Sequence, residues 1–167
     1  MTTTRTFKTA KQNIYRNLVL RTAKLALDDD EELDRPESEY PFDDGYELFA
    51  AGLAIGFLNE NRNEESRGNY SQDFIEIDNI SNDEYREAIN FVWELVKIRH
   101  DDLDETEAWE YARQYADAGV DKINREMEYR GEFDMIGLLS IFEGEWDETL
   151  EELLEKEKLE EAEIDTL

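Results

Sequence analysis

Cysteine is absent from the 167-residue sequence, and histidine occurs once. Without cysteine the chain has no disulfide, no thiol nucleophile and no thiolate metal ligand. It also has no run of about 18 apolar residues that could span a bilayer. The N-terminus lacks the short apolar core of a signal peptide. We therefore expect a soluble, cytoplasmic protein with no membrane partner.

Positive charge is also scarce, because 45 acidic residues outnumber 18 basic ones and give a net charge of -27. Adaptation to molar salt, mimicry of a nucleic-acid backbone and intrinsic disorder could each explain such a charge. A hydrophobic content of 40% and an aromatic content of 11% argue against disorder. The acidic residues are dispersed through every segment after residue 27, which favours the solvated surface of a halophilic protein over mimicry.

The basic residues gather at the start of the chain. Residues 1–27 contain six of them and no acidic residue, whereas residues 28–167 hold the other 12 and all 45 acidic residues. Apolar residues recur at helical spacing from Phe7 to Leu25, so we expect a basic N-terminal helical arm. The arm could pack on the acidic body or on a second copy, or it could contact DNA or an acidic partner. The last two alternatives would use Lys8, Lys11, Arg16, Arg21 and Lys24.

The rest of the chain divides into three parts. Residues 28–44 carry both prolines among many acids and are predicted to form a linker. Residues 45–150 are predicted to form a compact, mainly α core domain. At most one short strand or hairpin is expected, at residues 73–77. Residues 151–167 are predicted to be an acidic C-terminal helix or tail.

Small residues are concentrated in a predicted helix over residues 45–60. Glycine costs about 1 kcal/mol relative to alanine inside a helix, so its use there needs a compensating gain. The close approach of a second helix supplies such a gain, and Gly119 lies beside the apolar stripe of a later helix. The residues assigned to this packing role are Phe49, Ala50, Ala51, Gly56 and Gly119.

Further helices are predicted from their start and stop signals. Ser81 and Glu84 have the spacing of a capping box, and the helix that follows ends near His100. Asp104 is expected to cap a long helix that stops at Gly131. Residues 133–142 are predicted to form a short apolar helix.

No motif for catalysis or for a cofactor is evident. His100 falls at a predicted helix C-terminus, where its positive charge would be stabilised, and no nucleophile motif accompanies it. The run DDLDE at residues 101–105 lacks the glycine of a calcium loop, and there is no glycine-rich phosphate loop. We assign no catalytic residue, metal or cofactor, and an interaction protein is favoured over an enzyme.

Three segments, residues 42–62, 110–123 and 133–142, carry a resemblance to a known family. They are similar to the small accessory proteins of DNA phosphorothioation gene clusters, the Dnd-system-associated proteins. The resemblance covers residues 34–150, and the basic arm lies outside it. The matching positions are Phe49, Ala50, Ala51, Gly56, Arg62, Ala118 and Gly119.

This resemblance implies an accessory interaction subunit of a phosphorothioation-linked antiviral defence or restriction module. Its partners would be other subunits of the complex, with DNA as a further partner through the arm and Arg62. A homo-oligomer is compatible with it. Two alternatives stay open: a metal-dependent nucleic-acid or nucleotide enzyme, and an acidic DNA-mimic inhibitor.

The halophile hypothesis predicts how stability depends on salt. If repulsion among the 45 carboxylates limits folding in dilute buffer, the free energy of unfolding should rise steadily toward molar potassium chloride. Denaturant unfolding followed by circular dichroism along a salt series measures this. Equal stability at low and high salt would contradict the hypothesis and favour mimicry.

Overall fold

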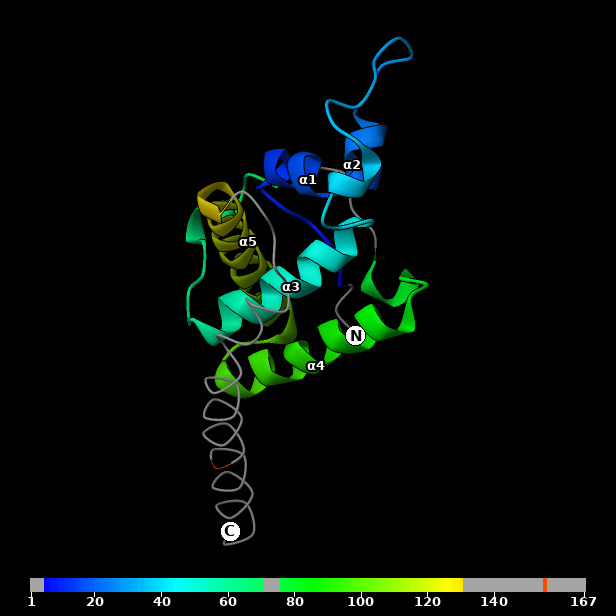
Figure 1. The fold of residues 1–167 in the computed structure, drawn as a ribbon. Helices are drawn as coiled ribbons and strands as arrows, with labels where there is room; N and C mark the ends of the chain where they lie inside the picture. Colours follow the sequence, from blue (N-terminus) through cyan, green and yellow to red (C-terminus); the bar gives the residue numbers. More distant parts are fainter. Residues whose placement is uncertain (1–4, 71–75, 131–154, 156–167) are drawn as a thin grey trace, which may run out of the picture.

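Three helices form the body of the molecule (Figure 1). The computed structural model describes residues 5–70, 76–130 and 155. In it α3 (Gly45–Leu58), α4 (Asp83–Arg99) and α5 (Glu105–Arg130) pack together, and α1 (Gln12–Leu18) and α2 (Leu20–Leu25) lie at one end of α3. The mainly α fold expected from the sequence is confirmed.

Extended structure is limited in the described residues to two isolated bridges, which join Thr6 to Glu76 and Val19 to Phe42. The strand expected at residues 73–77 falls largely outside these residues, and Ile77 begins a 3-10 turn, η3 (Ile77–Asn79). Two other 3-10 turns are η1 (Glu37–Glu39) and η2 (Glu64–Ser66). None of the described helices is both long and apolar enough to cross a membrane.

Helix α3 is buried on two sides and lies between two hydrophobic clusters. On one side its side chains pack with α4 and α5 around Trp93 and Trp109. On the other side they pack with α1, with Phe42 and with the far part of α5. Its side chains in the first cluster are Phe49, Leu53 and Phe57, and in the second Leu48, Ile55 and Leu58. A helix that is apolar around most of its circumference requires such a position.

Helices α3 and α5 touch through their backbones. A Cβ atom at Gly56 would overlap the carbonyl oxygen of Tyr115, and one at Gly119 would overlap the carbonyl oxygen of Gly52. A Cβ at Gly52 would lie 2.6 Å from the carbonyl oxygen of Ala116. The small residues of α3 therefore allow an approach that any larger side chain would prevent. Of the other residues assigned to packing, Phe49 is fully buried, and Ala50 and Ala51 are half-buried on opposite clusters.

The N-terminal segment packs in one hydrophobic cluster with α3 and α5. Packing on the body of the same chain was one of the alternatives that the sequence allowed for this segment. Tyr15, Leu18 and Val19 are almost fully buried. The segment does not form one continuous helix, because Val19 adopts extended angles. Phe42 of the expected linker bonds the backbone of Leu18 and Leu20 on either side of this break. As a result the apolar stripe is interrupted, and Leu25 at its end is 80% exposed.

The three helices of the body begin with different caps. Asp44 occupies the N-cap position of α3 but its side chain makes no capping bond. At α4 the cap is Asn82, one residue after the expected Ser81, and it accepts bonds from the backbone of Glu84 and Tyr85. At α5 the Asp104 carboxylate accepts a bond from the Glu107 amide at 2.8 Å, as expected. Gly131 and residues 133–142 and 151–154, like 156–167, lie outside the described residues.

The backbone contact predicts a specific effect of added methyl groups. Gly56→Ala and Gly119→Ala should each lower the free energy of unfolding by about 1–3 kcal/mol through overpacking. This loss should appear although alanine is intrinsically favoured in a helix by about 1 kcal/mol. Gly45→Ala is the matched control, because its Cβ would meet the Phe7 ring at an ordinary 3.5 Å. Equal stability of Gly56→Ala and Gly45→Ala in urea unfolding would contradict the close backbone contact between α3 and α5.

Candidate functional site

Helix α5 carries a buried polar stripe. Glu110, Gln114 and Asp117 follow one another at helical spacing and are 7%, 3% and 0% exposed. They face two segments that lack regular secondary structure over most of their length, residues 5–11 and residues 61–70. This stripe was not predicted from the sequence. The signal was present as polar residues at a spacing of three and four within the otherwise apolar central part of the helix.

Asp117 is the centre of one half of the stripe. Its carboxylate accepts hydrogen bonds from the Thr9 hydroxyl at 2.6 Å, from the Ala10 amide at 2.9 Å and from the Ser66 hydroxyl at 2.7 Å. The Thr9 hydroxyl in turn accepts a bond from the Lys11 amide. One side chain on α5 therefore holds both surrounding segments. A buried carboxylate is stable only when it is bonded in this way.

Burial raises the pKa of Asp117 above its ordinary range, and its three hydrogen bonds and the charge of Lys11 offset only part of this rise. The same carboxylate acts on Tyr15, whose pKa is raised by burial and by the negative charge of Asp117. The Tyr15 hydroxyl is buried and has no hydrogen-bond partner among the described residues. Burial therefore disfavours the charged forms of both Asp117 and Tyr15.

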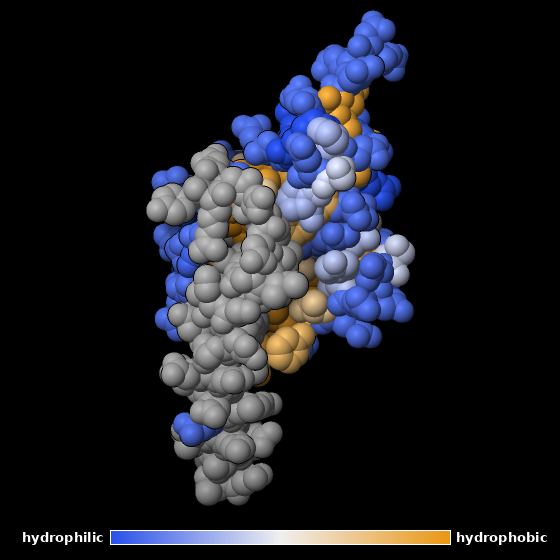
Figure 2. All heavy atoms as spheres, in the orientation of Figure 1, coloured by the Kyte–Doolittle hydropathy of each residue, from blue (hydrophilic) through white to orange (hydrophobic). Residues whose placement is uncertain are grey.

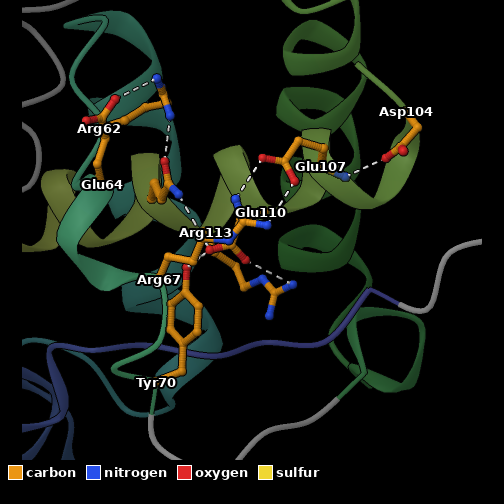
Figure 3. A network of polar contacts seen from close by, with 9 residues as sticks. Arg62, Glu64, Arg67, Tyr70, Asp104, Glu107, Glu110 and Arg113 are labelled. Carbon is orange, nitrogen blue, oxygen red and sulfur yellow. Dashed lines mark hydrogen bonds and ion pairs between the residues drawn. The ribbon is translucent and has the colours of Figure 1, made fainter.

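Glu110 is the centre of the other half, which Figure 3 shows. Its carboxylate accepts a hydrogen bond from the Tyr70 hydroxyl at 2.6 Å and lies 3.4 Å from the Arg113 guanidinium. Gln114 approaches the same oxygen as Tyr70, at 3.5 Å. Burial and the bond to Glu110 raise the pKa of the Tyr70 hydroxyl above its ordinary value. The Arg113 Nε is buried without a hydrogen-bond partner in the described part of the chain.

Two further arginines extend this network to the surface. Arg62 donates to the Gln114 side chain at 2.6 Å and to Glu64 at 3.1 Å, and its guanidinium lies 3.6 Å from the centre of the Tyr111 ring. Arg67 bonds both carboxylate oxygens of Glu107, at 2.9 and 3.1 Å. The contacts of Arg62 with Gln114, of Arg67 with Glu107 and of Tyr70 with Glu110 join the loop of residues 61–70 to the first half of α5 (Figure 3).

This arrangement is suited to holding the loop of residues 61–70 against α5. In the half of the network that Figure 3 draws, three arginines face three glutamates, and the tyrosine and glutamine bond inside it. Such side chains serve one another as donors and acceptors, and bidentate arginine pairs fix geometry well. Within the described residues, no group of three or more histidine or carboxylate side chains is arranged to hold a metal ion.

The basic residues expected to contact a partner are not all available. Lys24 pairs with Glu37 at 2.6 Å, Arg21 pairs with Asp44 at 3.2 Å, and Arg62 belongs to the network just described. Lys8 and Lys11 are half-buried. Arg16 is exposed on α1 and forms no ion pair within the described part of the chain.

His100 follows the last residue of α4, as the sequence predicted. Its Nε2 lies 2.7 Å from the Tyr115 hydroxyl, and its ring packs edge to face on Tyr111. The ring therefore links the end of α4 to α5. Gly56, Ala118 and Gly119 line a surface hollow of about 340 Å³ at the crossing of α3 and α5.

Comparisons of the chain with protein-family models, with curated proteins and with solved structures found no match.

The raised pKa of Asp117 predicts how stability depends on pH. The folded protein holds this proton more tightly than the unfolded chain, so the carboxyl stabilises the fold most below the ordinary aspartate pKa of about 3.9. That contribution is lost as the pH rises through the raised pKa. The difference in unfolding free energy, parent minus Asp117→Asn, should therefore fall with rising pH. The fall should be about 1.4 kcal/mol for each unit by which the pKa of Asp117 in the folded protein exceeds its pKa in the unfolded chain.

Denaturant unfolding at constant molar salt, from about pH 4 to about pH 7, measures this difference. Asp121→Asn is the matched control, since Asp121 lies on the same helix and pairs at the surface with Arg125. Its difference from the parent should change much less with pH. A pH-independent difference for Asp117→Asn would show that Asp117 does not titrate in this range.

Proposed function

We propose that this protein is an accessory interaction subunit of a phosphorothioation-linked antiviral defence or restriction module, in the cytoplasm of a halophilic cell. The observation that supports this most directly is the concentration of basic residues in the N-terminal segment. Three of the six basic residues in the first 27, Arg16, Arg21 and Lys24, lie on α1 and α2, which are together at one end of α3 (Figure 1). The same end exposes Leu25.

Most positions that carry the resemblance to Dnd-system-associated proteins lie on two helices that are in contact, α3 and α5. The positions that carry it are not scattered over the surface. Phe49, Ala50, Ala51 and Gly56 lie on α3, and Ala118 and Gly119 lie on α5. Arg62 bonds to α5 through Gln114. Two of the matching positions, Gly56 and Gly119, lie at the backbone contact between the helices, which supports the idea that the resemblance reflects a common framework.

Protein contacts are favoured over DNA contacts by the state of the basic residues. Arg21, Lys24 and Arg62 already pair with carboxylates of the same chain. Binding to DNA draws its strength from cations that neutralise phosphates and release counterions. A partner protein needs fewer free cations, because apolar contact supplies most of the affinity.

Purified subunits of a phosphorothioation and restriction module provide the test. The parent chain should co-elute with at least one of them in size-exclusion chromatography at molar salt. The variant Arg16→Glu, at an exposed position of α1, should weaken that complex about tenfold, which is about 1.4 kcal/mol. Arg125→Glu, an exposed change on α5, is the matched control and should leave the complex intact. Deleting residues 1–27 is unsuitable because it removes Tyr15 and Leu18 from the core.

Further measurements on the same preparations separate the alternatives. Labelled duplexes with and without a phosphorothioate linkage, titrated along a salt series, detect DNA binding by its linear loss with the logarithm of salt. Nuclease assays with magnesium or manganese detect a metal-dependent enzyme. Displacement of DNA from a subunit by the protein would indicate a DNA mimic. Binding to no subunit and to no duplex would refute the proposal.

A further inference from the structure

A hollow of about 240 Å³ opens beside α1 and α2. This volume lies slightly below the range of about 300–1,000 Å³ that is usual for ligand pockets, so the hollow suits a small ligand. Its lining is mixed. Phe7, Leu25 and Ala26 supply apolar surface, and Gln12, Arg16 and Thr22 supply polar groups. Small-molecule sites in proteins combine apolar walls with a few polar groups in this way.

Arg16 is the charged group of this hollow. The other two basic residues of α1 and α2 are occupied, because Arg21 pairs with Asp44 and Lys24 pairs with Glu37. Arg16 has no such pair within the described residues. Asp34 shares an adjacent hollow with Arg16 without forming an ion pair with it. Arg16 is therefore a lining residue of this hollow whose positive charge is not neutralised by a carboxylate of the described residues.

The apolar part of the hollow is open to solvent at its rim. Leu25 is 80% exposed and is one of two large apolar side chains exposed among the described residues. Figure 2 shows apolar residues at the surface near the end of α2, next to hydrophilic residues. Covering this surface with the apolar body of a ligand would remove it from water at a gain of about 25 cal/mol per Å².

We propose that this hollow binds a small monocarboxylate with a short unbranched apolar body. The guanidinium of Arg16 pairs with the carboxylate, and the Gln12 amide and the Thr22 hydroxyl supply further donors. The apolar body lies against Phe7, Leu25 and Ala26. Arginine suits this role because its planar fork matches a carboxylate. The hollow shares Arg16 with the proposed partner surface, and ligand binding is tested in the absence of the defence subunits.

The test uses the full chain and hexanoate as the probe. Backbone amide shifts on α1 and α2 are followed by NMR in the lowest salt that keeps the protein folded, with sodium chloride added to equal ionic strength as the blank. Hexanoate should give saturable shifts at residues around the hollow. Affinity should fall by about fourfold for each methylene removed, through butyrate to acetate, because one buried methylene contributes about 0.8 kcal/mol.

Two comparisons assign the site. Arg16→Gln should weaken hexanoate binding at least tenfold, whereas Arg125→Gln, an exposed arginine on α5, should leave it unchanged. Hexanamide, which has the same body without the charge, should bind the parent at least tenfold more weakly than hexanoate. Absence of saturable shifts with hexanoate would overturn the proposal. Equal binding of hexanoate to the parent and to Arg16→Gln would overturn it as well.

Discussion

The rest of the fold depends on the contact between the backbones of α3 and α5. At Gly52, Gly56 and Gly119 the main chain of each helix fills the space that a side chain of the other would need. Because the two helices are so close, the larger side chains of α3 lie on either side of the contact, where they pack with side chains of α5 and of the neighbouring elements. One side receives α4, and the other receives α1 and Phe42. Two clusters around one helix are thus a geometric consequence of a few missing methyl groups.

Helix α5 is left with a side that no helix of the body covers, and this side is polar. Residues 5–11 and 61–70 lie against it with few apolar side chains of their own, so packing alone would hold them weakly. Asp117 and Glu110 hold them through hydrogen bonds instead. The cost is a desolvated carboxylate, visible in the raised pKa of Asp117. Bonds of this kind fix position more narrowly than apolar contact does.

The sequence predicted the features that are set by local periodicity. The helices that became α3, α4 and α5, the cap at Asp104 and the end of α4 beside His100 all follow from short patterns. The break at Val19 does not, because it is made by pairing with Phe42, far away in the chain. The buried role of Asp117 was equally hidden. In a sequence with 45 acidic residues, one more carboxylate on a helix looks like a surface residue until its partners Thr9 and Ser66 are brought beside it.

Ion pairs and buried apolar side chains contribute unequally to holding the N-terminal segment in place. Its surface pairs, such as Lys24 with Glu37, are largely exposed and contribute at most about 1 kcal/mol each, less at molar salt. Burial of Tyr15 and Leu18 is worth more, since each large side chain contributes about 1.5–3 kcal/mol and salt does not screen it. The segment is therefore held by its apolar side chains. Its positive charges are not needed to keep it in place, and Arg16, which has no carboxylate partner in the described part of the chain, is free to meet an anion from outside.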